Sequence, residues 1–198
     1  PTTDPTAKPI PTAPSLFREY IAQLIEHDKQ FLIVGNMNAT AYKHIFPLFK
    51  ANAVWYGPSG SSGSVEFRVP DHYLLKASSL RVDDRGNKYI SMKCVRWFTN
   101  LTHEKRHRDL DLDRTYSPEQ YPVYDNYDAI EVSKTRDIPA DYPGAMGVPI
   151  TFFDRYNPDQ FEILGLMNSF DLGVPYINGT ALYTRVVIRN KHLHSSTD

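Results

Sequence analysis

The chain has 198 residues, 41% of them hydrophobic and 13% aromatic, which predicts one folded domain, or one with an insertion. Its formal net charge of −1 and isoelectric point of about 6.8 exclude attraction to nucleic acid through overall charge, so such a surface must be a local patch. One cysteine excludes a disulfide framework, and no apolar run approaches the roughly 20 residues of a membrane span, so we expect a cytoplasmic protein that does not bind membranes.

The first residues differ in composition from the rest of the chain. Residues 1–14 contain five prolines, Pro1, Pro5, Pro9, Pro11 and Pro14. Proline fixes φ and removes a hydrogen-bond donor, which disfavours both helices and central strands. The sequence therefore predicts a disordered or extended tail over residues 1–14, an α/β segment over residues 15–56 and a mainly β region over residues 57–198.

The α/β segment alternates helices and strands. Apolar residues at helical spacing from Leu16 to Ile25 predict a helix with Ser15 as its N-cap. The apolar run Phe31–Val34 predicts a strand buried on both faces, as in a parallel sheet. A helix over Tyr42–Lys50, kinked or split at Pro47, and a strand over Val54–Tyr56 follow. This order is typical of a doubly wound α/β sheet, which places residues 35–38 at the edge of a ligand site.

The remainder of the chain is predicted to be mainly β structure. Residues 57–64 are rich in Gly and Ser but lack the Lys-Ser/Thr ending of a phosphate-binding loop, so a flexible loop is the better interpretation. Strands are expected over residues 64–69, 88–98, 127–133, 160–167 and 181–189. The turn Asp84–Asn87 predicts a hairpin.

His103-Glu104-Lys105-Arg106-His107 has the spacing of a zinc-binding helix, with Glu104 as general base and Asp113 where some such enzymes place a third ligand. The expected glycine turn is absent, since Leu110 stands there. The motif is also polar on all sides, whereas a zinc-site helix packs against a core. Zinc is therefore the weaker interpretation of His103 and His107.

The same region also forms a basic patch interleaved with aromatic residues. It contains Lys93, Arg96, Trp97, Phe98, Lys105, Arg106 and Arg108. Such residues suit phosphate contact and base stacking, although a solvated charged turn after a core strand is an equal alternative. Asn36 and Asn38 could hydrogen-bond a base edge or a cofactor, or form an Asx turn. Glu131 and Lys134 are one residue too far apart for a nuclease motif on one strand face.

Several strings of this sequence resemble EcoRI-type adenine-specific DNA methyltransferases. They occur in the same order, over the residues 15–20, 31–39, 95–101, 124–132 and 146–152. The resemblance runs from Ser15 to about Lys191. It implies the second half of a class I, Rossmann-like methyltransferase sheet followed by a mainly β target-recognition region. It also implies S-adenosylmethionine as cofactor and double-stranded DNA as partner.

The resemblance also shows where this chain departs from the family. The family's chemistry depends on Asn-Pro-Pro-Phe directly before the Ser15–Tyr20 segment, where the Asn and a Pro carbonyl orient the target amine and the Phe stacks on the flipped adenine. Those four places hold Pro11-Thr12-Ala13-Pro14 here. We therefore expect no catalytic residue in this chain, no assignable cofactor site and no methyl transfer by the chain alone.

Three functional hypotheses follow. In the first, the chain is a fragment or the DNA-recognition part of an adenine-N6 methyltransferase of a restriction–modification system, with a missing amino-terminal half as a partner. Its expected DNA-binding residues are Asn36, Asn38, Arg96, Trp97, Lys105, Arg106 and Arg108, with Trp97 either stacking on a base or lying in the core. The second is a non-catalytic DNA-binding module, and the third a zinc hydrolase using His103, Glu104 and His107.

Overall fold

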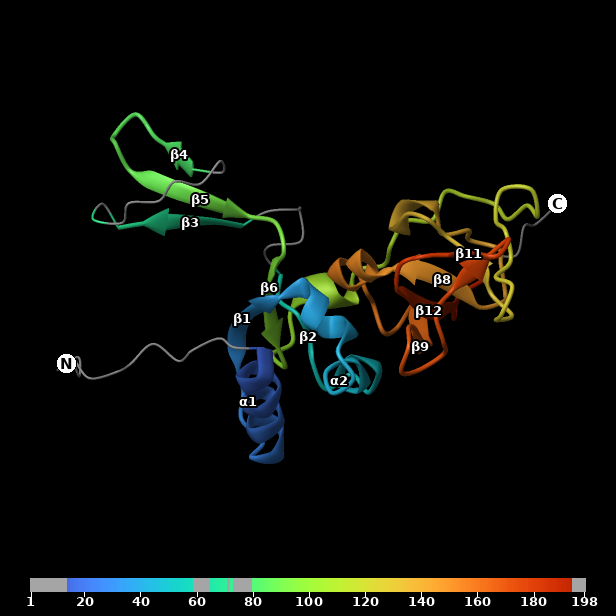
Figure 1. Ribbon diagram of the computed structural model, residues 1–198, viewed down its shortest axis with the longest axis horizontal. Helices are drawn as coiled ribbons and strands as arrows, with labels where there is room; N and C mark the ends of the chain where they lie inside the picture. The colour runs from blue at the N-terminus through green and yellow to red at the C-terminus, as the bar shows by residue number, and fades with distance from the viewer. Residues whose placement is uncertain (1–13, 59–64, 71, 73–79, 194–198) are drawn as a thin grey trace.

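The computed structural model describes residues 14–58, 65–70, 72 and 80–193. Within this part of the chain the molecule is elongated (Figure 1). One three-stranded sheet projects at one end, and a four-stranded and a two-stranded sheet lie at the other. The second three-stranded sheet lies between them, together with the longest helix. The predicted tail before Pro14 and residues 59–64 of the predicted loop lie outside the described residues.

The helices are few and mostly short. They are α1 (Pro14–Glu26), α2 (Phe46–Lys50) and the 3-10 helices η1 (Met37–Ala41), η2 (Glu104–His107), η3 (Thr135–Asp137) and η4 (Ile150–Asp154). The strands are β1 (Leu32–Asn36), β2 (Trp55–Tyr56), β3 (Val65–Val69), β4 (Leu80–Val82), β5 (Lys88–Met92), β6 (Val95–Thr99), β7 (Ile130–Glu131), β8 (Met146–Pro149), β9 (Phe161–Met167), β10 (Tyr176–Ile177), β11 (Thr180–Ala181) and β12 (Arg185–Asn190).

The central sheet has the strand order β1–β6–β2. Both outer strands pair antiparallel with β6, so the prediction that Phe31–Val34 forms a strand within a parallel sheet is wrong. The strand is not buried on both faces either, because Leu32 is 51% exposed and Val34 38%. The predicted α/β character is confirmed. The helix predicted over Tyr42–Lys50 is shorter, because α2 begins at Phe46 with Pro47 in its first turn, where the missing N–H costs nothing.

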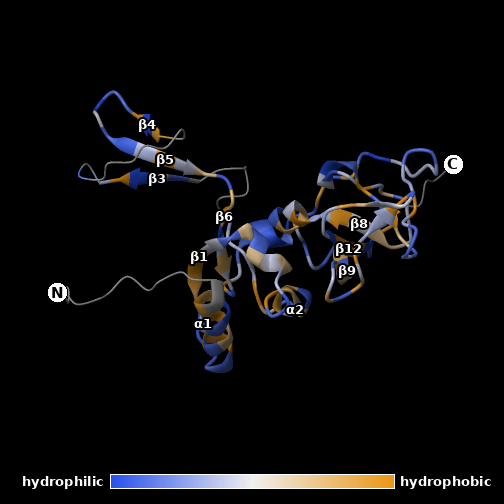
Figure 2. Ribbon diagram, in the orientation of Figure 1, coloured by the Kyte–Doolittle hydropathy of each residue, from blue (hydrophilic) through white to orange (hydrophobic). Residues whose placement is uncertain are grey.

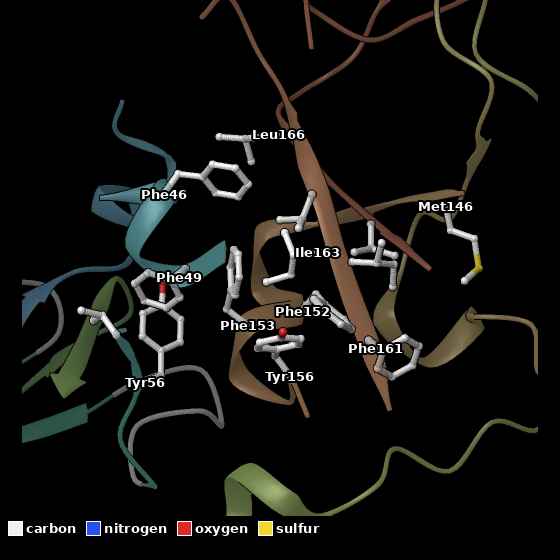
Figure 3. Close-up of a cluster of buried hydrophobic side chains, with 14 of the residues drawn as sticks. Phe46, Phe49, Tyr56, Met146, Phe152, Phe153, Tyr156, Phe161, Ile163 and Leu166 are labelled. Atoms are coloured by element: carbon white, nitrogen blue, oxygen red, sulfur yellow. The ribbon is translucent and has the colours of Figure 1, made fainter. Parts of the chain in front are cut away.

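An aromatic cluster joins the central sheet to the rest of the chain (Figure 3). Phe49 of α2 lies at its middle, with its ring centroid 5.8 Å from Phe98 of β6, 5.3 Å from Tyr56 of β2 and 5.0 Å from Phe153 of η4. All three pairs meet edge to face, which aromatic quadrupoles favour. Phe49 therefore ties the central sheet to the carboxyl-terminal sheet.

The carboxyl-terminal sheet has the order β7–β8–β12–β9. Strands β7 and β8 pair parallel, and the other pairs are antiparallel. Its core residues Met146, Val186 and Ile188 are fully buried. The predicted strand over 160–167 is confirmed, whereas the one over 127–133 is reduced to β7 and the one over 181–189 divides into β11 and β12.

The predicted strand over 88–98 breaks at Lys93 and Cys94 into β5 and β6, which belong to different sheets. The carbonyls at the break are used by other groups: Arg96 Nη1 donates to Lys93 O at 3.2 Å, and Met37 N donates to Cys94 O at 2.7 Å. Strand β5 instead pairs with β3 and β4. The predicted hairpin turn before β5 is confirmed, with Gly86 at φ +80° in the left-handed region.

Gly35 allows α1 to approach β1 closely. A Cβ at this position would lie 2.6 Å from the Phe17 ring and 2.8 Å from the Phe98 ring. Gly35→Ala should therefore lower the free energy of unfolding by about 1–3 kcal/mol through overpacking. Urea unfolding followed by tryptophan fluorescence measures this, with Cys94→Ala, at an exposed site, as the control. An unchanged midpoint for Gly35→Ala would show that α1 does not pack on β1 in this way.

Candidate nucleic-acid interface

Arg96 lies in β6, the middle strand of the central sheet, and is only 3% exposed. Its Nε donates to Asp154 Oδ1 at 2.6 Å and its Nη2 to Asp154 Oδ2 at 2.9 Å, while Nη1 donates to the carbonyls of Lys93 and Val95. The hydrogen bonds from Arg96 to Asp154 raise the pKa of Arg96. This geometry argues against the prediction that Arg96 contacts a DNA phosphate, because its donors are already used inside the protein.

Arg106 is also withdrawn from the surface, at 8% exposed. Its guanidinium carbon lies 3.7 Å from the centroid of the Trp55 ring, and its Nη2 donates to Asn52 Oδ1 at 3.0 Å. Burial lowers the pKa of Arg106. Arg106 therefore positions η2 against β2, and the exposed cation of this segment is Arg108.

The two histidines of the zinc motif point to different partners. His103 precedes η2, and its Nε2 lies 2.9 Å from Tyr56 O; His107 Nδ1 lies 2.9 Å from Asp159 Oδ2. The zinc motif requires an α-helix so that residues four apart share a face, but η2 is a 3-10 helix with three residues per turn. In the described part of the chain no three His, Cys, Asp or Glu side chains group as metal ligands. The zinc interpretation thus loses its geometric basis.

Asn36 and Asn38 are exposed at the end of β1. Asn36 Oδ1 accepts a hydrogen bond from Asn38 N at 2.9 Å and so caps η1. This is the Asx geometry that the sequence offered as one alternative. The Asn38 side chain has no hydrogen bond to another described residue, and its role in DNA binding stays a prediction.

Trp97 is half-buried on the open face of the central sheet. It pairs in register with Val34, so the two side chains share one face of the sheet. Leu32 lies on the same face. A Cβ added at Gly57 would lie 3.6 Å from the Cδ1 of Leu32. Trp97 therefore belongs to a partly exposed apolar face of the central sheet.

A cleft that the sequence did not reveal lies beside Asp154. It has a volume of about 490 Å³ and is lined by Arg96, Leu110, Ser133, Lys134, Thr135, Arg136, Pro149, Thr151, Asp154 and Arg155. We call it the basic cleft. Lys134 and Arg155 are exposed, and neither forms a side-chain hydrogen bond or ion pair with another described residue. The one carboxylate in its lining, Asp154, is neutralised by Arg96.

The basic cleft and the basic segment around η2 are electrostatically connected. Burial is the main cause that lowers the pKa of Lys105. The negative charge of Asp154 opposes this shift, and the positive charges of Arg155, Arg108 and Arg96 add to it. Asp154 borders both the basic cleft and a small pocket lined by His103, Lys105 and Arg106. Lys105, Arg108, Lys134 and Arg155 thus form one positively charged region on a chain whose net charge is −1.

Sequence reasoning missed the basic cleft because its residues come from separate segments. Lys134 and Arg136 enter with η3, Arg155 follows η4, and Ser133 and Thr151 supply hydroxyls. The Lys134-x-Arg136 spacing was visible in the sequence, but the neighbouring Glu131 suggested a different motif. In the structure Glu131 is buried and accepts a hydrogen bond from Arg185 at 2.8 Å. Its negative charge therefore does not neutralise the cations of the basic cleft.

The chain belongs to the EcoRI adenine-specific methyltransferase family, whose model matches residues 9–191. It is 49% identical to the Type II methyltransferase M.EcoRI of Escherichia coli over 181 residues, or 90% of this chain and 56% of the relative. It is 37% identical to the Type II methyltransferase M.MpnI of Mycoplasma pneumoniae over 90% of this chain and 55% of the relative, and 35% identical to M.MgeORF184P of Mycoplasma genitalium over 90% of this chain and 62% of the relative.

The chain therefore spans a little over half the length of the relatives it matches. No solved structure gives a significant match. Among the described residues, no helix combines the length and apolar character that crossing a membrane requires.

Breaking the buried ion pair should destabilise the fold. Asp154→Asn leaves the Arg96 charge buried without its partner, and we expect the free energy of unfolding to fall by about 3–5 kcal/mol. The matched control is Glu162→Gln, which removes the carboxylate of the exposed Arg189–Glu162 pair and should cost less than about 1 kcal/mol. Equal losses in denaturant unfolding would contradict the structural role given to Arg96.

Proposed function

We propose that this chain supplies the DNA-holding portion of an adenine-N6 methyltransferase of a restriction–modification system. The observation that carries the proposal is the basic cleft, whose exposed Lys134 and Arg155 have no neutralising partner among the described residues. DNA phosphates are the ligand that such a region suits, because binding them releases condensed counterions. The family and the names of the relatives supply the reaction, methyl transfer to adenine.

The end of β1, where the sequence placed the edge of a ligand site, does not fit S-adenosylmethionine. The strand end that the sequence pointed to, Gly35-Asn36, is followed by η1, and the Asn36 carboxamide is already used to cap that helix. No acidic residue lies beside it in the Gly35–Asn38 segment. We therefore assign the cofactor that the family implies to another part of the enzyme, and we assign no step of methyl transfer to the residues of this chain.

The central sheet supports the proposal that it continues into a Rossmann-like methyltransferase sheet. Strand β1 lies at the edge of this sheet, and both β1 and β2 run antiparallel to β6 and hence parallel to each other. Leu32 and Val34 of β1 are exposed, and so are Leu16 and Tyr20 of α1. Figure 2 shows β1 in the colour of hydrophobic residues. Because exposed apolar edge strands invite pairing, we infer that an amino-terminal methyltransferase half covers this surface.

Methyl transfer should require that second half. We expect the chain alone to transfer no radiolabelled methyl group from S-adenosylmethionine to duplex DNA. Adding the separately produced amino-terminal portion of M.EcoRI should restore transfer, and Leu32→Asp in β1 should prevent the restoration. The control is Val123→Asp, which places the same charge at a site of similar exposure, 53% against 51%, outside the central sheet, the basic cleft and the sheet β3–β5–β4. Methyl transfer by the chain alone would refute the proposal that the amino-terminal half is required.

The basic cleft should set the salt dependence of DNA binding. The double variant Lys134→Gln, Arg155→Gln should weaken binding to any duplex and reduce the slope of log K against log salt by about 2. The control double variant Lys29→Gln, Arg189→Gln removes two exposed cations elsewhere and should leave the slope unchanged. Fluorescence anisotropy across a salt series measures both. Equal slopes for the two double variants would remove the cleft from the interface.

A further inference from the structure

The three-stranded sheet β3–β5–β4 stands apart from the rest of the molecule (Figure 1), and we call it the arm. Among its strand side chains whose burial is described, only Val69 is buried, so the arm is not part of the core. It is joined to β6 through Lys93 and Cys94, directly beside the Arg96–Asp154 pair that borders the basic cleft. A sheet held out from the core at the edge of a charged region needs an explanation other than folding stability.

The two faces of the arm differ in chemistry. The register pairs Glu66 with Ser91, Arg68 with Tyr89 and Arg81 with Tyr89, so these residues share one face. The intervening positions, such as Phe67, Ile90 and Leu80, share the other. We call the first the polar face, defined by Glu66, Arg68, Arg81, Tyr89 and Ser91. Its two arginines outnumber its one carboxylate.

The side chains of the polar face are held in place by one another. Arg81 donates to both carboxylate oxygens of Glu66, at 3.1 and 2.8 Å, and its guanidinium lies 4.7 Å from the centroid of the Tyr89 ring. Arg68 Nη2 donates to Asn87 Oδ1 at 2.7 Å. Yet Arg81 and Glu66 remain 52% and 45% exposed. These hydrogen-bonding groups are therefore ordered before any partner arrives, which lowers the entropic cost of binding.

We infer that the polar face of the arm reads base edges in the major groove of duplex DNA, and this inference rests on the proposed function. The major groove, about 12 Å wide, admits a two-stranded β-ribbon. The antiparallel pair β4–β5 of the arm is such a ribbon, with β3 along its other edge. Arginine pairs with guanine and glutamate with cytosine, and the polar face presents Arg68, Arg81 and Glu66. The arm adjoins the basic cleft, so phosphate contacts there would position it.

The acidic tip of the arm is consistent with this orientation. Asp83 accepts hydrogen bonds from Arg85 N, Asn87 N and Asn87 Nδ2, and so holds the hairpin turn. Asp84 adds a second carboxylate there. Arg85 adds one cation, so the turn Asp83–Asn87 carries a net charge of −1, which gives the tip itself little attraction for the phosphates.

The test is selection of duplexes from a randomised library by the full chain, followed by affinity measurements on the enriched motif. The wild-type chain should enrich a sequence motif. Arg81→Gln, Arg68→Gln and Glu66→Gln should each reduce discrimination at one base pair by about 5- to 150-fold. The control is Arg189→Gln, which breaks an exposed cross-strand Arg–Glu pair of matched exposure, 50% and 51%, on β12 and β9. It should leave the motif and the discrimination unchanged.

Glu66→Gln separates base reading from simple electrostatics. If the polar face only attracts DNA by charge, removing a carboxylate strengthens binding to every duplex alike, and that outcome would overturn the inference. Base reading predicts instead a change of preference at a single position. A wild-type motif that survives in all three arm variants, or DNA binding without any motif, would also overturn it. Failure of the wild-type chain to bind any DNA would instead refute the proposed function.

Discussion

Arg96 and Asp154 form a buried ion pair at 2.6 Å that fixes how the parts of this molecule meet. Arg96 lies in the central strand β6, and Asp154 ends η4, which leads into the carboxyl-terminal sheet. The remaining donor of Arg96, Nη1, binds the Lys93 carbonyl at the base of the arm. One guanidinium therefore contacts the central sheet, the basic cleft and the arm. Such a charge requires its partner, because an unpaired buried charge is strongly destabilising.

The surface charge follows from this arrangement. The chain carries 22 Lys and Arg against 23 Asp and Glu, so DNA affinity cannot come from its overall charge. The structure instead gathers Lys105, Arg108, Lys134 and Arg155 near Asp154, whose own charge Arg96 compensates. Cations that were predicted to face DNA, Arg96 and Arg106, lie inside and hold this region in place, while cations from η3 and the end of η4 stand outside.

Local patterns predict the elements better than their assembly. The helix from Leu16 to Ile25, the hairpin at Asp84–Asn87 and the strand over 160–167 could all be predicted, because periodicity and turn residues act over short distances. The predicted parallel sheet is wrong because Phe31–Val34 is an apolar run whose pairing partner, β6, lies over 60 residues onward, as in the pair Ile33 and Phe98, and register across such a distance leaves no local signal. The zinc motif is misleading for the related reason that its spacing has meaning only on an α-helix, and η2 is a 3-10 helix.

The family resemblance identified the family, which local patterns could not do. The structure distinguished buried from exposed side chains, which the resemblance could not do. The resemblance gave the family, which the match over residues 9–191 confirms. It did not distinguish buried from exposed arginines, and it gave no reason to single out Lys134 or Arg155. Nor did it separate the arm from the core, which depends on the break at Lys93 and Cys94.

The basic cleft and the arm are together the surface through which we propose that this chain holds duplex DNA. Hydrogen–deuterium exchange of the chain with and without duplex DNA tests this most directly, since protection reports backbone segments that binding covers or orders. We predict added protection in residues 133–136, 151–155 and 80–92, and unchanged exchange in β10 and β11. Protection absent from all three segments while DNA is bound, or confined to β10 and β11, would contradict the proposal.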